Sequence, residues 1–314
     1  MQNELTTSQI QACIEYYLHV LKVKDYSVHT IALKTEHLAM FTSWLNTQKV
    51  VDLADVTLDI FERYMGYLRL KKSDNHPDKY LSISTVRCRL TTVRVFLQFL
   101  TKRAFISHRE VEKFELPSVG LILPKPILSY QDVLRVIKQI PHNTIKGIRD
   151  RAMLECFYAT GMRRGEMANL DILDVDFSQR QLRIIHGKGK KDRYVPFGNM
   201  ATTWLIKYLR DTRPVLAKAN TVNAFFLNSQ GQRCKPSQLS GLMSKYIKKA
   251  NINKTGACHQ YRHAAATHML DNDADIRHVQ ELLGHASIST TQLYLHVSKA
   301  KLRSVYAKTH PRAT

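Results

Sequence analysis

Residues 259–296 read HQYRHAAATHMLDNDADIRHVQELLGHASISTTQLYLH and contain the most specific pattern in the chain. The spacing of apolar residues in this stretch predicts two helices, over about 259–270 and about 275–283. His259 and Arg262 lie three positions apart, so both side chains face the same side of the first helix. This stretch therefore places a basic, hydrogen-bonding pair on one helical face.

The region before this stretch is predicted to mix helices with short strands. Apolar periodicity, caps and turn residues indicate the elements. They are helices from Ser129–Asp132 through Ile140, over Ile145–Thr160 (closed by Gly161), and over about 199–211 and 237–250, with strands over Leu182–His186 and Arg193–Phe197. The two strands flank a Gly-Lys-Gly turn, which is typical of a hairpin. Near the C-terminus, Lys299–Ala307 is predicted to be a short amphipathic helix.

The first hundred residues are predicted to form a bundle of four helices. Apolar residues recur at spacings of three, four and seven in four segments, so each segment has one apolar face. Ser27, Thr57 and either Ser82 or Ser84 can cap three of these helices. The stretch Lys71–Lys79 is polar and contains a proline, which predicts a loop.

Three prolines, Pro117, Pro124 and Pro126, mark a boundary between two domains. Proline removes amide donors and favours extended backbone, so we expect a linker over 106–125. The predicted organisation is an N-terminal helical domain over 1–105 and a second domain over 126–314. The predicted fold class is mainly α with a small antiparallel β-sheet, that is, α+β.

The charge of the chain points to a polyanionic partner. The 314 residues carry 47 Lys+Arg and 26 Asp+Glu, a formal net charge of +21. Residues 1–124 contribute only +3 of this charge and residues 125–314 contribute +18. Nucleic acid is the favoured partner, and we expect its backbone to lie mainly on the second domain.

Composition also argues against several other classes of protein. No apolar run approaches the roughly 18 residues that a membrane-spanning helix needs. The first residues include Glu4 and no apolar core, so we expect no signal peptide and a cytoplasmic protein. The five cysteines lie 75, 68, 78 and 24 positions apart, without CxxC spacing, which disfavours a zinc ribbon or a disulfide scaffold.

Cutting a DNA phosphodiester without a metal ion demands a recognisable set of side chains. Two guanidiniums can hold the non-bridging oxygens of the phosphate, while a nucleophile attacks and an acid protonates the leaving 5′ oxygen. Candidates for such a set occur in five motifs, which are Gly161–Glu166, Gly187–Gly189, His259–His263, Leu283–His285 and Tyr294.

These motifs resemble the tyrosine recombinase (phage-integrase-like) family, in its Xer-like or mobile-element two-domain branch. The most specific segments are Tyr261–His268 and Glu281–His285, the second followed by Ser289–Gln292 and Tyr294. The resemblance covers the whole chain and implies an N-terminal core-DNA-binding (SAM-like) domain, a linker, and a catalytic domain with a C-terminal docking tail. All motifs occur in the family's order.

The resemblance implies a role for each matching residue in the first motifs. Arg163 matches the first arginine that binds the scissile phosphate, although Met162 stands where the family has leucine. Glu166 matches an acidic residue that supports the site. Lys188, in the hairpin turn, matches the lysine that protonates the leaving 5′ oxygen. Arg164 is an additional cation, for which a solvated surface position is the simpler interpretation.

The remaining motifs match the rest of the catalytic set. Arg262 matches the second arginine of the phosphate clamp, and His259 a group that stabilises the transition state and transfers a proton. His285 matches a residue that hydrogen-bonds the phosphate, and Tyr294 matches the nucleophile. His259 and His263 also have the i,i+4 spacing of zinc helices, but HExxH is absent, so we expect no metal and no cofactor.

The resemblance implies site-specific recombination of double-stranded DNA core sites through a 3′-phosphotyrosyl intermediate and a Holliday junction, without metal or ATP. It implies a homotetramer on DNA, or a heterotetramer with a second recombinase. Chromosome or plasmid dimer resolution and mobile-element integration or excision both remain open. So do a type IB topoisomerase-like relaxing enzyme and a non-catalytic DNA-binding accessory protein of the same fold. Further DNA contacts are expected from Lys34, Arg87, Arg94, Lys190, Lys191 and Arg193.

Overall fold

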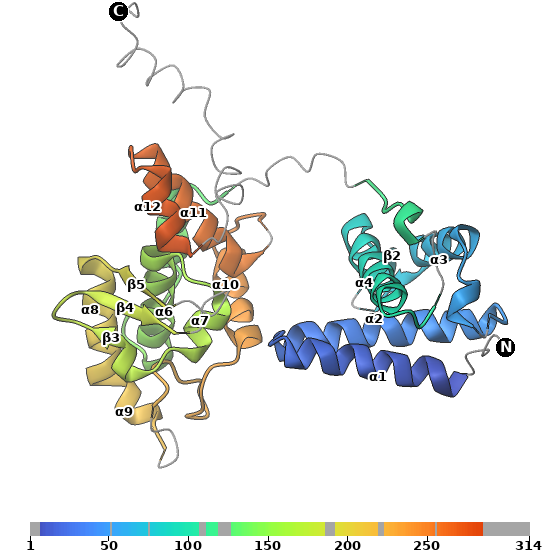
Figure 1. Cartoon of the computed structure of the whole chain (residues 1–314). Helices are drawn as coiled ribbons and strands as arrows, with labels where there is room; N and C mark the ends of the chain where they lie inside the picture. The colour runs from blue at the N-terminus through green and yellow to red at the C-terminus, as the bar shows by residue number, and fades with distance from the viewer. Residues whose placement is uncertain are drawn as a thin grey trace, which may run out of the picture. The chain divides into compact units, whose positions relative to one another are not determined.

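The structure is a computed structural model that describes residues 7–50, 52–74, 76–106, 111–118, 127–185, 192–218, 223–254 and 256–284. The chain divides into two compact units, Met1–Ile122 and Leu123–Thr314 (Figure 1). Helices predominate and the described strands form two small antiparallel sheets. The predicted α+β fold class is therefore confirmed.

The first unit is a helical bundle with a fully buried core. Its helices are α1 (Thr7–Val23), α2 (Val28–Thr47), α3 (Leu58–Leu70) and α4 (Ile83–Lys102). The side chains of Ser27, Thr57 and Ser82 accept hydrogen bonds from the first turns of α2, α3 and α4, so Ser82 rather than Ser84 caps α4. Phe41 and Tyr64 are among the largest buried side chains, with ring centroids 4.9 Å apart.

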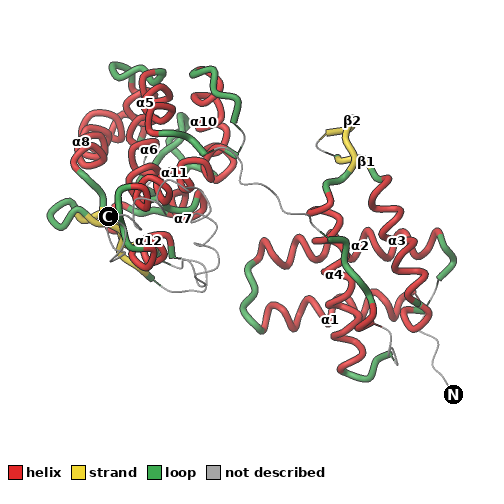
Figure 2. The backbone as a smooth tube through the Cα atoms, turned by 90° about the horizontal axis from the view of Figure 1, so that it is seen from above, coloured by secondary structure: helices red, strands yellow, loops and turns green. Residues whose placement is uncertain are grey.

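The polar stretch before α4 is a β-hairpin, so the prediction of a loop over Lys71–Lys79 is wrong. Strands β1 (Lys72–Ser73) and β2 (His76–Tyr80) pair antiparallel and extend away from the helices of this unit (Figure 2). Every residue of β2 is exposed, so no apolar alternation signals the strand. Pro77 is tolerated because a two-stranded ribbon has an open edge.

Part of the predicted linker packs into the core of the first unit. Ile106, Val111 and Phe114 are buried there, and the Phe114 ring stacks on Phe61 with centroids 4.5 Å apart. The prolines that mark the boundary lie beyond these residues. Local sequence does not reveal the packing, because it depends on contacts with α3 and α4.

The second unit surrounds the apolar helix α6. Its elements are α5 (Tyr130–Lys138), α6 (Ile145–Thr160), α7 (Arg164–Asn169), β3 (Val175–Asp176), β4 (Gln181–Ile184), β5 (Arg193–Pro196), α8 (Asn199–Lys207), α9 (Arg213–Leu216), α10 (Pro236–Lys249), α11 (Ala257–Asp271) and α12 (Ile276–Leu283). A π-helical turn, Tyr208–Thr212, joins α8 to α9. The buried side chains of Met153, Leu154 and Phe157 place α6 in the middle of the core.

The predicted hairpin of this unit is confirmed and gains a third strand. Strand β4 pairs antiparallel with β5, in a register that sets Ile184 opposite Arg193, and with β3 on its other edge. Strand β3 has only two residues, too few for a period of two to show in the sequence. None of the helices in the described ranges is long and apolar enough to cross a membrane.

Candidate active site

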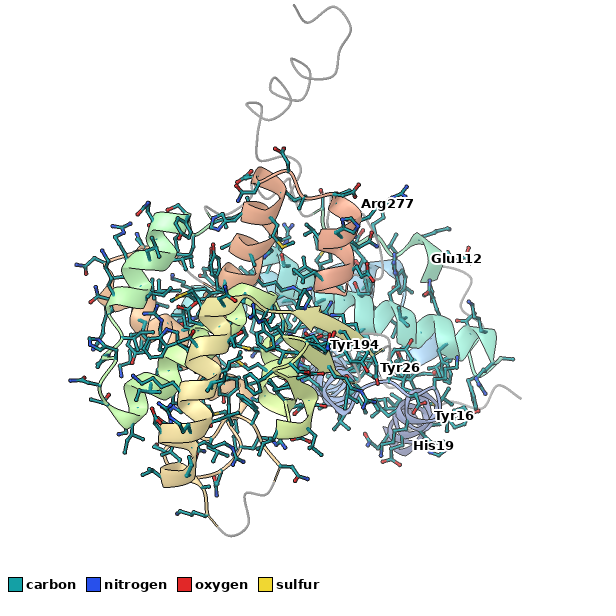
Figure 3. All side chains as sticks on the ribbon, turned by 90° about the vertical axis from the view of Figure 1, so that its left-hand side faces the viewer. Tyr16, His19, Tyr26, Glu112, Tyr194 and Arg277 are labelled. Carbon is teal, nitrogen blue, oxygen red and sulfur yellow. The ribbon has the colours of Figure 1, made fainter. Side chains whose placement is uncertain are left out.

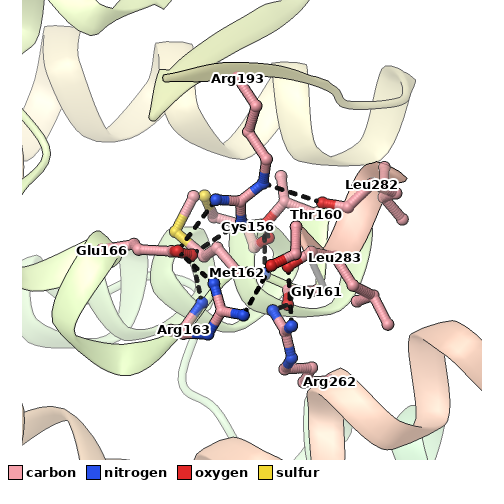
Figure 4. Close-up of polar contacts among 11 residues, drawn as sticks. Cys156, Thr160, Gly161, Met162, Arg163, Glu166, Arg193, Arg262, Leu282 and Leu283 are labelled. Atoms are coloured by element: carbon pink, nitrogen blue, oxygen red, sulfur yellow. Dashed lines mark hydrogen bonds and ion pairs between the residues drawn. The ribbon is translucent and has the colours of Figure 1, made fainter. Parts of the chain in front are cut away.

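The C-terminal end of α12 accepts hydrogen bonds from three arginines that come from three other elements (Figure 4). The accepting carbonyls belong to consecutive residues: Leu282 accepts from Arg193 Nε at 3.2 Å, Leu283 from Arg262 Nη2 at 2.7 Å, and Gly284 from Arg163 Nη2 at 2.9 Å. The last carbonyls of a helix lack partners within the helix and carry partial negative charge, so cations stabilise them. Directly after this end, the sequence continues with His285 and then Tyr294.

Arg163 and Glu166 form a compact unit at the beginning of α7. Glu166 Oε1 accepts from Arg163 Nη1 at 2.8 Å, and Glu166 Oε2 accepts from the Arg163 backbone amide at 2.7 Å. The Arg163 side chain remains 25% exposed, whereas that of Glu166 is 7% exposed. The buried carboxylate thus orients a guanidinium that solvent, and therefore a ligand, can reach.

The charge on Glu166 is maintained by its partners. Burial favours the neutral acid, but hydrogen bonds from the Arg193 side chain and the Arg163 backbone outweigh it and lower the pKa of Glu166. The carboxylate is therefore ionised at neutral pH.

Arg262 joins two chain segments from a buried position on α11. Its Nη1 donates to the Gly161 carbonyl at 2.6 Å and its Nη2 to the Leu283 carbonyl. Gly161 ends α6 with φ 56°, and a Cβ on it would lie 2.8 Å from Leu283 Cδ2. Glycine there allows the end of α6 and the end of α12 to approach, and Arg262 ties the two together.

His259 lies on α11 one turn before Arg262. Although the residue reaches solvent, partial desolvation and then the positive charges of Arg164, Arg262 and Arg163 lower the pKa of His259 from its ordinary 6.5. The imidazole is therefore neutral at pH 7 and able to accept a proton. Arg164 is exposed and donates to Ser240 Oγ at 3.2 Å.

The structure brings together four of the residues predicted from sequence, namely Arg163, Glu166, His259 and Arg262. Five others lie outside the described residues: Lys188, Lys190, Lys191, His285 and Tyr294. Their roles remain predictions.

The three cations predicted to bind DNA from the first unit all have contacts within that unit. Lys34 Nζ lies 3.4 Å from Tyr17 Oη, Arg87 Nη1 donates to the Pro117 carbonyl, and Arg94 Nη1 donates to the Phe114 carbonyl. Burial lowers the pKa of Lys34. In this structure Arg87 and Arg94 hold the chain that leaves the bundle, which their sequence context does not indicate.

Arg193, also predicted to contact DNA, points into the protein and is 11% exposed. The sequence around it, Lys-Lys-Asp-Arg, carries no signal for this orientation because the partners lie on α7 and α12. No group of three or more His, Cys, Asp or Glu side chains that could hold a metal ion occurs among the described residues.

Removing the charge of Glu166 is expected to change the acid stability of the second unit. Because the folded pKa lies below the unfolded value near 4.5, the ionised carboxylate stabilises the fold above that pH, and this contribution is lost as the pH falls further. Glu166→Gln should therefore cost about 3 kcal/mol at pH 7, and the difference from wild type should shrink below pH 4.5. Thermal unfolding measured between pH 7 and 3.5 tests this.

Asp192→Asn provides the control for Glu166→Gln. Asp192 pairs with Arg183 at 3.4 Å, but both side chains are about half exposed. Its loss should change stability by less than about 1 kcal/mol. If the loss of stability caused by Glu166→Gln stays constant with pH, the conclusion that its partners keep Glu166 ionised is wrong.

Comparison with known proteins identifies the family. Residues 128–301 match the model of the phage integrase family. The chain is 36% identical over 298 residues to tyrosine recombinase XerC 2 of Ralstonia nicotianae, covering 95% of this chain and 85% of that protein. It is 36% identical over 301 residues to tyrosine recombinase XerD of Staphylococcus epidermidis, covering 96% and 99%.

A solved structure has the same fold. The Tn1549 transposon integrase, in complex with a circular intermediate DNA, superimposes with a TM-score of 0.73 over 94% of this chain and 99% of that chain, at 16% identity. Three observations point to the same family: the order of the motifs, the arginines that meet at the end of α12, and the relatives matched over most of their length. The chain therefore belongs to the phage integrase family of tyrosine recombinases, enzymes of DNA strand exchange.

Proposed function

We propose that Tyr294 is the nucleophile with which this recombinase cuts a specific DNA site. The observation that carries the proposal is the meeting of Arg163 and Arg262 at the end of α12, the helix from which the chain leads to Tyr294. Two planar guanidiniums beside one another suit the non-bridging oxygens of one phosphate.

The proposed chemistry is a transesterification. Tyr294 Oη attacks the phosphorus and forms a 3′-phosphotyrosyl ester, while the bond between phosphorus and the 5′ oxygen breaks. A tyrosine hydroxyl has an ordinary pKa near 10, so its proton must leave during the attack, and neutral His259 accepts it. Lys188 donates a proton to the leaving 5′ oxygen, and Arg163, Arg262 and His285 stabilise the charge on the phosphate.

The ester retains the energy of the broken bond, so a 5′ hydroxyl from a partner duplex can reseal it without a nucleotide cofactor. We propose that four protomers, identical or with a second recombinase, exchange strands between two duplexes through a Holliday junction. The +18 charge of residues 125–314, including Lys190 and Lys191, supports a grip on the DNA backbone. We place this activity in the cytoplasm.

Trapping the covalent intermediate tests the proposed chemistry. A binding site is first selected from duplexes with randomised centres, and a nick is then placed near the cleavage point so that a short 5′-hydroxyl fragment diffuses away. With EDTA present, we expect the wild-type protein to form a protease-sensitive DNA adduct on a denaturing gel. Absence of the adduct would overturn the proposed chemistry.

A second measurement separates recombination from relaxation. Supercoiled plasmids carrying one or two copies of the selected site are incubated with the protein. Recombinant products and branched junctions are expected only with two sites. A ladder of relaxed topoisomers with one site, and no recombinants with two, would instead indicate a topoisomerase.

A further inference from the structure

Arg193 has an unusual set of contacts for a residue that directly follows a basic stretch of sequence. It is the first residue of β5, and its guanidinium bonds to Glu166 at both ends, with Nη1 donating to Oε1 and Nη2 to Oε2, each at 2.9 Å. Its Nε donates to the Leu282 carbonyl at 3.2 Å. A planar group with parallel donors is suited to this bidentate geometry, whereas an ammonium is not.

Arg193 contacts two groups that position the proposed phosphate clamp of Arg163 and Arg262. Glu166 is the carboxylate that orients Arg163, and Leu282 lies in the end of α12 that also receives Arg163 and Arg262 (Figure 4). Gly284 packs directly on the same guanidinium, since a Cβ on it would lie 2.9 Å from Arg193 Cζ. One side chain thus contacts α7, α12 and the turn that follows α12.

We propose that Arg193 is a positioning residue for DNA cleavage, acting through Glu166 on Arg163 and through Leu282 and Gly284 on the chain that leads to Tyr294. The inference rests on the proposed active site. With Arg193 in place, Glu166 is held from two sides, so the Arg163 guanidinium has one orientation. Without it, the carboxylate can turn and the end of α12 loses one of its three cations.

A contact with DNA is the competing interpretation of the same residue. Its bidentate pairing with Glu166 argues against this interpretation, because an ion pair this well formed would have to break for each phosphate bound. The two interpretations predict different losses: a DNA contact affects affinity, whereas a positioning residue affects the rate of cleavage by bound protein.

The test compares Arg193→Ala and Arg193→Lys with Arg183→Ala. Arg183 lies on the neighbouring strand β4 with a half-exposed side chain, so its replacement removes the same charge from the same sheet outside the site. Affinity for the selected duplex is measured over a range of salt concentrations, and the cleavage rate under single-turnover conditions on the nicked substrate.

Arg193→Ala is expected to bind DNA with the affinity and salt dependence of Arg183→Ala, but to cleave it about 100-fold more slowly. Arg193→Lys, which keeps the charge and most of the stem, should show a smaller loss and remains informative if the alanine variant does not fold. Combined with Glu166→Gln, Arg193→Ala should add little further loss, because both changes act on the same contact.

Three results would overturn the inference: an unchanged cleavage rate in both Arg193 variants, a defect confined to affinity and salt dependence, or full additivity with Glu166→Gln. Failure of the proposed active site is recognised separately, since the wild-type protein itself would then form no adduct.

Discussion

We expect Tyr294→Phe to abolish the covalent adduct on the nicked substrate and to leave DNA binding unchanged. The substitution keeps the aromatic ring and removes only the oxygen that forms the phosphotyrosyl ester. No other group can then form this ester, so we expect a loss of about 10⁴-fold or more. The measurement is adduct formation on a denaturing gel, with the dissociation constant for the intact duplex measured in parallel.

A second tyrosine provides the control for this result. Tyr194 directly follows Arg193 on β5, and 62% of it is exposed to solvent (Figure 3). Tyr194→Phe should retain the adduct at nearly the wild-type rate. An adduct in the Tyr294→Phe protein, or a DNA-linked peptide that maps to one of the other 13 of the 14 tyrosines, would disprove the assignment.

The predicted site residues that the structure brings together belong to patterns that are short and local. Arg163 and Glu166 follow the glycine that ends α6, and their spacing of three lets the Glu166 side chain reach the Arg163 backbone within one turn. His259 and Arg262 share a helical face for the same reason. Such relationships need no knowledge of the rest of the chain.

Contacts between segments that lie far apart in the chain cannot be predicted from local sequence patterns. Arg193 and Glu166 are 27 positions apart, and Arg193 and Leu282 are 89 apart. The sequence near Arg193 therefore predicts a DNA contact from its basic neighbours and does not indicate partners on α7 and α12. Likewise, Phe114 falls within the predicted linker, because its position against Phe61 depends on how α3 and α4 pack rather than on residues nearby in sequence.

Arg262→Ala is expected to slow cleavage by about 10²–10³-fold and also to destabilise the second unit. The guanidinium is one half of the proposed phosphate clamp, and loss of one such electrostatic group has effects of this size. The same change deprives the buried Gly161 and Leu283 carbonyls of charged donors, at a cost of about 1–3 kcal/mol each. Thermal unfolding and single-turnover cleavage well below the melting temperature measure the two effects.

Arg213→Ala separates the catalytic from the structural loss. Arg213 also holds backbone carbonyls in the second unit, with Nη2 donating to Ala224 at 2.8 Å and Nε to Phe225 at 3.3 Å, and these two carbonyls lie outside the site. Arg213→Ala should lower the melting temperature about as much as Arg262→Ala does, and it should leave the cleavage rate unchanged. Arg262→Lys should recover part of the stability and little of the rate, because one ammonium cannot replace a planar group that serves two carbonyls and a phosphate. If Arg262→Ala and Arg213→Ala cleave at the same rate, Arg262 serves folding alone and the clamp must be sought among other cations.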